Sequence, residues 1–241
     1  MSEPELSVVF PVFNEKDNLP ILMGEIRSAI DPLAIDYEVI AVDDGSSDGS
    51  SEVLVELRRQ HPMLRILTFA RNSGQTAALD AGWRAARGRY IVSLDADLQN
   101  DPADIPKMLA RARAEGADMV IGVRVNRQDT LSKKIQSKIG NGVRNWITRD
   151  HIQDTGCSLK LVRRQSIEKV KLFTGMHRFL PTLVRLEGHK VAEMPVNHRP
   201  RKFGVSKYGA MNRAARGLAD CLAVRWMSRR MLRYEVAERN D

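Results

Sequence analysis

The sequence contains little cysteine, few aromatic side chains and no long apolar run. Two cysteines among 241 residues, Cys157 and Cys221, cannot form a disulfide framework, so we expect a reducing compartment. Aromatic residues make up 5% of the chain, which argues against a nucleic-acid-binding module with stacking platforms. No uncharged apolar stretch approaches the roughly 18 residues that a membrane-spanning helix needs. The N-terminal stretch MSEPELSVVF lacks the basic and apolar regions of a signal peptide, so none is expected.

Several catalytic signatures are also missing. The sequence has no G-x-S-x-G motif, no glycine-rich phosphate loop with its lysine, and no histidine spacing typical of a metal site. Cys157 has no catalytic partner near it in sequence, and we interpret it as a small packed side chain. These absences argue against serine hydrolases, P-loop enzymes and histidine-ligated zinc enzymes.

Positive charge is abundant and unevenly placed. The net charge is +8, and basic residues gather between Arg124 and Arg149 and between Arg199 and Arg233, whereas residues 1–70 are acidic to balanced. Basic faces suit the phosphates of nucleotides, nucleic acids or anionic lipids. For any single Lys or Arg, a solvated surface position is the simpler explanation. The 43% of apolar residues suffices for a folded core.

Apolar runs alternate with helical patterns over the first half of the chain. We expect strands at residues 6–13, 37–42, 64–70, 90–94 and 118–123, with a helix after each of the first four. Asn14 is suited to cap the first helix, and Gly88 to end the third, which we expect over residues 75–87. Such alternation predicts a largely parallel sheet with helices on both faces.

The pattern changes after Arg124. A helix is expected around residues 131–147, strands at 159–162 and 191–196, a short helix at 179–186 and a C-terminal helix at 208–234. The C-terminal helix mixes arginines with leucine, methionine and tryptophan, which is typical of a helix at a membrane interface. A helix packed on the domain with a solvated basic face explains the same composition equally well.

Polar clusters follow four of the expected strands. They are Phe13-Asn14-Glu15, Asp43-Asp44, Arg71-Asn72 and Asp95-Ala96-Asp97. In parallel α/β sheets, ligands bind beyond the carboxyl ends of the strands. We therefore expect these clusters to share one rim of the sheet and to form the functional site.

The stretch SLDADLQNDP concentrates carboxylates where a buried strand stops. Asp95, Asp97 and Gln99 alternate, so their side chains can point the same way. Carboxylates this close repel one another unless a cation or a proton intervenes, and hard oxygen ligands suit Mg²⁺ or Mn²⁺. The alternative is a loop of helix caps, a role that Asp101 before Pro102 fits well.

Two further segments contain groups that could bind parts of a nucleotide. The turn DDGSSDG, which includes Asp44, presents acceptors for the N–H groups of a nucleobase or the hydroxyls of a ribose, although turn formation alone also explains it. The segment RKFGVSKY contains a glycine, cations and a hydroxyl, including Arg201, Ser206 and Lys207. Such a loop could close over a diphosphate, although basic loops are common.

Taken together, these motifs resemble a known family. V-F-N-E (12–15), V-D-D-G-S-S-D (42–48), R-N-S-G-Q (71–75) and D-A-D-L-Q (95–99) follow the order found in family 2 inverting glycosyltransferases. D-T-G-C-S-L-K (154–160) and H-R-P-R through S-K-Y (198–208) are similar to segments of polyprenyl-phosphate sugar synthases. The resemblance covers about residues 6–208.

The resemblance implies a GT-A fold over residues 1–208, with residues 209–241 forming a basic amphipathic helix that could attach to a membrane interface. The implied nucleotide-binding residues are Pro11, Phe13, Glu15, Asp44, Asp95, Arg201, Ser206 and Lys207. The implied ligands of Mg²⁺ or Mn²⁺ are Asp95, Asp97 and Gln99. The implied acceptor-phosphate residues are Arg124, Lys133 and Ser137. The implied catalytic residues are Asp97, Asp154, Arg201 and Lys207.

The activity implied by the resemblance is transfer of a hexose from GDP-mannose or a UDP-sugar to a polyprenyl monophosphate, with inversion. The partners would be the nucleotide sugar, the lipid phosphate and a membrane surface, with no nucleic acid, and the enzyme would lie peripherally on the cytoplasmic face. One rival hypothesis is a family 2 enzyme that transfers to a sugar hydroxyl and requires a true base, for which Asp154 is the candidate. Two more distant hypotheses are a module that binds nucleic acid in a salt-dependent way and an inactive nucleotide-binding scaffold.

Overall fold

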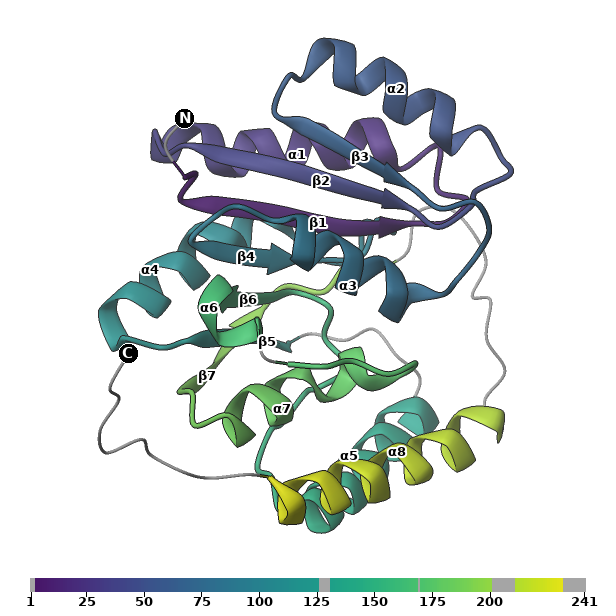
Figure 1. Ribbon diagram of the computed structural model, residues 1–241, viewed down its shortest axis with the longest axis vertical. Helices are drawn as coiled ribbons and strands as arrows, with labels where there is room; N and C mark the ends of the chain where they lie inside the picture. Colours follow the sequence, from purple (N-terminus) through teal and green to yellow (C-terminus); the bar gives the residue numbers. More distant parts are fainter. Residues whose placement is uncertain (1–2, 126–130, 169, 201–210, 232–241) are drawn as a thin grey trace, which may run out of the picture.

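The computed structural model describes residues 3–125, 131–168, 170–200 and 211–231, with the backbone alone over 131–139 and 211–216. The described strands form one mixed seven-stranded sheet in the order β3-β2-β1-β4-β6-β5-β7 (Figure 1). The strands are β1 (Leu6–Val12), β2 (Tyr37–Asp43), β3 (Leu64–Thr68), β4 (Tyr90–Ser93), β5 (Met119–Arg124), β6 (Lys160–Arg163) and β7 (Val191–Val196). Neighbouring strands are parallel except around β6, which runs antiparallel to both β4 and β5.

Helices cover both faces of this sheet (Figure 1). They are α1 (Leu19–Ile30), α2 (Ser50–Gln60), α3 (Gln75–Ala85), α4 (Ile105–Glu115), α5 (Leu131–Thr148), α6 (Arg164–Ile167), α7 (Leu180–Leu186) and α8 (Met211–Arg230), with the 3₁₀ turns η1 (Asp31–Leu33), η2 (Pro102–Asp104) and η3 (Met176–Phe179). Helices α1, α2 and α4 share one buried cluster with the sheet, while α3, α7 and α8 share the other. The predicted mostly parallel α/β sheet with helices on both faces is confirmed.

The central strand β1 explains why both faces are buried. Val8 and Phe10 pack into the cluster with α1, whereas Val9 packs into the cluster with α3. A strand covered on both sides buries every side chain, so it appears in the sequence as a continuous apolar run. The same reasoning applies to β2, where all residues but Tyr37 are buried.

The reversed direction of β6 determines what lies at the rim. Because β6 is antiparallel to β4, Lys160 at its start pairs with Ser93 at the end of β4. The segment that enters β6, residues 154–159, therefore arrives at the same edge of the sheet as the carboxyl end of β4. Periodicity predicted the strand but not its direction, because direction depends on which neighbours it pairs with.

Two local predictions were wrong. Asn14 does not cap α1: it adopts a left-handed backbone with φ of 58°, its side-chain oxygen accepts a hydrogen bond from the Ser47 N–H, and α1 begins after Asn18. Gly88 does not end α3, which stops at Ala85. Gly88 instead lies against the backbone of β1, where a Cβ atom would come within 2.5 Å of the Ser7 nitrogen.

Helices α5 and α8 lie side by side at one end of the molecule (Figure 1). Helix α8 buries Cys221 and Val224 in the core, so it packs on the domain. Its other side exposes Leu222 and Trp226, and α5 exposes Trp146, whose relative accessibility is 83%. Within the described ranges, no helix is both long and apolar enough to cross a membrane.

Candidate active site

The polar clusters at the ends of β1, β2 and β3 are joined by hydrogen bonds. The carboxylate of Asp44 accepts from the backbone N–H groups of Ser73 at 2.6 Å and Gly74 at 2.8 Å, one on each oxygen. Gly45, with φ of 71°, allows the two loops to approach, because a Cβ atom there would lie 2.7 Å from the Arg71 carbonyl carbon. The shared rim predicted from the sequence is therefore present, and Asp44 organises it.

Three of the predicted nucleotide-binding residues belong to β1 and the loop after it. Pro11 lies beyond Val9, the last residue of β1 that pairs with β4, so its missing N–H costs no ladder hydrogen bond. Phe13 is partly buried just after the strand. The carboxylate of Glu15 accepts from the side-chain amide of Asn18 at 2.5 Å, which fixes the carboxylate at the start of α1.

The loop that follows β4 carries Asp95, Asp97 and Gln99, and we refer to it as the acidic tip. Leu98 is buried with a left-handed φ of 61°, and this turn lets an Asp97 oxygen accept from the Gln99 N–H at 3.1 Å. The side-chain amide of Gln75, at the start of α3, donates to Asp95 at 2.7 Å. The Gln99 amide nitrogen donates to the Arg199 carbonyl at 3.4 Å, which leaves its oxygen as the atom that could bind a cation.

Burial raises the pKa of Asp95, and the neighbouring negative charge of Asp97 raises it further. A divalent cation would relieve both costs, and carboxylate and amide oxygens are the ligands that Mg²⁺ and Mn²⁺ prefer. No group of three or more His, Cys, Asp or Glu side chains suited to an ion occurs in the described part of the chain. The residues fit an ion that completes its coordination with water and donor phosphate oxygens, as Mg²⁺ commonly does.

Arg124 and Asp154 meet at the same rim. Arg124 ends β5, and Asp154 lies in the segment before β6. The guanidinium Nε and Nη2 atoms donate to the two carboxylate oxygens at 2.7 and 2.8 Å, and the Arg124 N–H also reaches the carboxylate at 3.3 Å. This fork-shaped contact fixes the direction of both side chains.

A cavity of about 450 Å³ opens between the acidic tip and this ion pair. Its lining includes Asp95, Arg124 and Asp154 from the predicted set. The other lining residues are Gln75, Leu79, Trp83, Ser93, Leu94, Asn141, Thr155, Gly156, Ser158, Lys160, His177 and Arg178. The structure thus brings one metal candidate, one acceptor candidate and one catalytic candidate around a common space, whereas Pro11, Phe13, Glu15 and Asp44 are not part of that lining.

Sequence reasoning missed the cations on the opposite wall. Lys160 belongs to a motif that the resemblance used, but no role was assigned to it, and His177 is one of the histidines whose spacing indicates no metal site. The His177 Nδ1 atom is hydrogen-bonded at 2.7 Å to the hydroxyl of Thr76, which also accepts from the Gly175 N–H at 2.9 Å. Only the three-dimensional pairing of β4 with β6 brings Lys160 to this cavity.

Arg199 anchors the segment that leads to the predicted basic loop. Its guanidinium contacts both Glu25 carboxylate oxygens at 2.8 and 2.9 Å and Asp101 at 2.6 Å, while its N–H donates to the Gln99 carbonyl at 2.9 Å. Arg201, Ser206 and Lys207 lie outside the described residues. The side chains of Lys133 and Ser137 on α5 are likewise outside the description.

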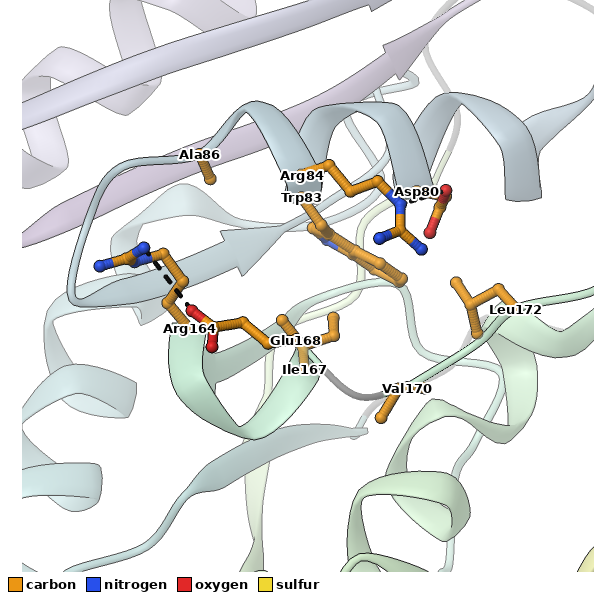
Figure 2. Close-up of a pocket in the computed structure, with 9 residues that line it drawn as sticks. All are labelled: Asp80, Trp83, Arg84, Ala86, Arg164, Ile167, Glu168, Val170 and Leu172. Atoms are coloured by element: carbon orange, nitrogen blue, oxygen red, sulfur yellow. Dashed lines mark hydrogen bonds and ion pairs between the residues drawn. The ribbon is translucent and has the colours of Figure 1, made fainter. Parts of the chain in front are cut away.

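A second hollow of about 270 Å³ lies between α3 and α6 (Figure 2). Trp83 lines this hollow and also the larger cavity, so its indole forms a wall between the two. In the close-up, Arg84 points toward Asp80 and Arg164 toward Glu168, so the charged side chains pair with one another at the edges of the hollow. None of the predicted site residues lines it.

A mostly parallel sheet with an acidic pair at the end of β4 and one reversed strand defines a nucleotide-sugar transferase of the GT-A type. Residues 7–171 match Glycosyl transferase family 2, and the chain belongs to this family. It is 42% identical over 232 residues to a dodecaprenyl-phosphate galacturonate synthase of Rhizobium johnstonii, covering 93% of this chain and 68% of that protein. The chain is therefore a glycosyltransferase that resembles polyprenyl-phosphate sugar synthases, as the motifs suggested.

Solved structures support the fold. Glucosyl-3-phosphoglycerate synthase from Mycobacterium tuberculosis, in complex with Mn²⁺, UDP-glucose and phosphoglyceric acid, superposes with a TM-score of 0.68 at 18% identity, covering 92% of this chain and 80% of that one. A mannosyltransferase from Pyrobaculum calidifontis in complex with GDP-mannose and Mn²⁺ has a TM-score of 0.61 at 16% identity, covering 95% of this chain and 74% of that one. At these identities the likeness concerns the fold, and the GT-A prediction is confirmed.

Proposed function

We propose that this chain transfers a sugar from a nucleotide diphosphate donor to a polyprenyl monophosphate, inverting the anomeric centre. The observation that carries the proposal is that one cavity is lined both by Asp95 of the acidic tip and by the Arg124–Asp154 pair. Such a cavity could accept a donor diphosphate beside Arg124, whose guanidinium would bind the acceptor phosphate. The name of the 42%-identical relative supports the lipid phosphate as acceptor.

The donor half of the site is assigned to the rim loops. Pro11, Phe13, Glu15 and Asp44 would bind the base and ribose, with Asp44 also holding the loop at Ser73 and Gly74 through the hydrogen bonds described above. Asp95, Asp97 and Gln99 would hold Mg²⁺ or Mn²⁺, which when bound supplies positive charge to the donor diphosphate. Arg201, Ser206 and Lys207 would complete the diphosphate site, and this assignment stays a prediction.

The acceptor half is assigned to Arg124 together with Lys133 and Ser137. A phosphate oxygen is already anionic at neutral pH, so the nucleophile needs no strong base. The protein must instead hold two phosphate-bearing substrates together and offset their repulsion. Arg124 and Lys133 on the acceptor side, with Arg201 and Lys207 on the donor side, would do this. Asp154 then orients Arg124 and the sugar, because a carboxylate with both oxygens engaged by a guanidinium is a weak proton acceptor.

We further propose that the enzyme works at a membrane surface. The acceptor's polyprenyl chain is apolar, and the exposed Trp146 of α5 and Trp226 of α8 lie on helices that also carry arginines. Tryptophan and arginine together are typical of interfacial helices. Residues 1–208 would act as the catalytic domain and residues 209–241 as the attachment, on the cytoplasmic face of the membrane.

The test combines purified protein, Mn²⁺, polyprenyl phosphate and a panel of radiolabelled donors. The panel contains GDP-mannose, UDP-hexoses and UDP-hexuronates, the last because the relative is named for galacturonate. We expect label to enter the organic phase with one donor, and the Asp97→Ala variant to lose it. Asp80→Asn, which changes a partly exposed carboxylate paired with Arg84 on α3, is the matched control and should keep activity. Absence of transfer to the lipid with every donor would refute the acceptor assignment.

A further inference from the structure

One wall of the cavity carries two cationic side chains and a histidine that the proposed transfer does not use. Lys160 comes from β6, while His177 and Arg178 come from η3, and all three line the cavity. The charges of Lys160 and Arg178 both act on the His177 ring, so the three side chains share one region. We refer to Lys160, His177 and Arg178 as the cationic wall.

Lys160 is a buried ammonium group with unused donors. Its residue is 5% exposed, and its Nζ donates to the carbonyl oxygen of Cys157. An ammonium group has three N–H donors, and among the described residues no carboxylate forms an ion pair with this one. Burial lowers the pKa of Lys160, and the nearby charges of Asp95 and Asp154 offset this only in part, so an anionic ligand in the cavity would stabilise the charged ammonium group.

Arg178 adds a second cation at the mouth of the cavity. It follows Gly175, whose left-handed φ of 89° begins the η3 turn that carries His177 and Arg178. The charge of Arg178 acts on Asp220 of α8, but within the described part of the chain no ion pair joins them. Arg178 is exposed, so its guanidinium can meet an incoming ligand.

The other charges that line the cavity are already matched. Asp154 is engaged by Arg124, and Asp95 belongs to the acidic tip that would hold the cation and the diphosphate. Lys160 and Arg178 line the cavity without an ion pair to any described carboxylate, so a sugar bound on their side would meet both cations. A neutral hexose offers hydroxyl groups to such a wall, whereas an acidic sugar offers a full negative charge.

We propose that the cationic wall is a specificity site for the carboxylate of a hexuronate donor, with Lys160 and Arg178 binding the carboxylate and His177 donating a hydrogen bond beside it. This inference rests on the proposed function, because it concerns the sugar of the same donor. A carboxylate matches the planar donor pair of an arginine, and a charge-assisted contact discriminates against an uncharged analogue.

The experiment compares UDP-galacturonate with UDP-galactose, which differ only at C6. Donor binding is measured by calorimetry with Mn²⁺ and without acceptor, and kcat/KM is measured with polyprenyl phosphate. We expect the wild-type protein to favour the uronate by about tenfold to a hundredfold in both measurements, the range expected of a charged hydrogen bond. Arg178→Gln and Lys160→Gln should each reduce the uronate-to-hexose ratio at least about tenfold, and Arg178→Lys should retain part of it.

Arg84→Gln is the matched control, because it removes an exposed arginine of α3 that pairs with Asp80 outside the cavity. It should leave the ratio unchanged. Equal losses for both donors in the Arg178 and Lys160 variants would overturn the inference, since the anion bound there would then be a phosphate common to both. Equal affinity of the wild-type protein for the two donors would overturn it as well. Absence of lipid transfer would refute the proposed function, while the binding ratios would still decide the role of the cationic wall.

Discussion

The Arg124 guanidinium and the Asp154 carboxylate form a two-point ion pair, with N–O distances of 2.7 and 2.8 Å. Both side chains are largely buried, at 17% and 9% exposure. The sequence suggested separate roles for them, one on the acceptor phosphate and one on the sugar or as a base. Because both carboxylate oxygens accept hydrogen bonds from the guanidinium, we propose that Asp154 positions Arg124.

This relationship predicts the effect of Asp154→Asn. The amide keeps the shape but loses the charge, so Arg124 should be less well held and the KM for polyprenyl phosphate should rise about tenfold. Turnover should fall but remain measurable, because a phosphate nucleophile needs no base. Steady-state kinetics with varied acceptor check this, with Asp80→Asn as control. Complete loss of turnover with donor binding intact would instead point to a base and to a sugar-hydroxyl acceptor.

A second prediction concerns the contact between the rim loops at Gly45. Gly45→Ala places a Cβ atom 2.7 Å from the Arg71 carbonyl carbon in a left-handed backbone. We expect a loss of about 2–4 kcal/mol in the free energy of unfolding and weaker donor binding, because the loop held by Asp44 must shift.

Gly116→Ala is a matched control: its φ is also positive, at 59°, but no atom lies within 4 Å of the added Cβ atom. It should cost about 1 kcal/mol and leave donor binding unchanged. Chemical denaturation and calorimetry with UDP test both variants, and equal effects would show that steric contact at Gly45 is unimportant.

The type and order of the elements were predictable because the central strands are buried on both faces. In β2 and β4, burial on both sides requires continuous apolar runs, and these end where polar rim residues begin. Boundaries in the loops were less predictable. Asn14 has the composition of a helix cap, but its side chain is occupied by the N–H of Ser47, thirty-three residues away.

Site residues were predictable from the sequence only where a single segment contains both the end of an apolar strand and the polar residues that follow it. The acidic tip at Asp95 and Asp97 follows directly from the end of an apolar run. The cationic wall does not, because Lys160 reaches the cavity only through the antiparallel pairing of β6 with β4. The contact of Asp44 with Ser73 and Gly74 joins two loops that follow different strands. Such contacts between distant segments produce no recognisable residue spacing in the sequence.

A third prediction is a pH dependence of stability from His177. Burial, and then the charges of Lys160 and Arg178, lower the pKa of His177 to about 3 from its ordinary value of 6.5. As the pH falls below 6.5, the unfolded chain binds a proton that the folded chain does not, so the free energy of unfolding decreases down to about pH 3. Between pH 7 and pH 5, the wild-type protein should lose about 1–2 kcal/mol more than His177→Asn.

Urea denaturation of both proteins at the two pH values measures this difference. Because every other titrating group is common to the two proteins, their contributions cancel in the comparison. The asparagine also preserves a polar partner for the Thr76 hydroxyl, which limits the change to the loss of the titrating ring. Parallel losses in the two proteins would mean that the ring accepts a proton as easily in the folded state as in the unfolded one.

The last prediction concerns the exposed face of α5 and α8. Trp146 and Trp226 are 83% and 64% exposed, which is a large apolar cost in water unless the face meets a membrane or a partner. The charges of Arg149, which directly follows α5, and of Arg229 on α8 act on Arg225, so these three arginines lie close together, and Arg225 precedes Trp226 in the sequence. Apolar side chains next to clustered arginines favour an anionic bilayer surface.

We expect the protein to sediment with vesicles that contain anionic lipid, and the double variant Trp146→Ser/Trp226→Ser to bind them about tenfold or more weakly. Raising the salt concentration should weaken binding of the wild-type protein, since each arginine near the surface contributes about 1 kcal/mol. Phe173→Ser, which removes an exposed aromatic that belongs to neither helix, is the control and should bind normally. If the double variant is folded and binds vesicles like the wild-type protein, the tryptophans serve a protein partner instead, and the acceptor lipid must reach the cavity without the help of this face.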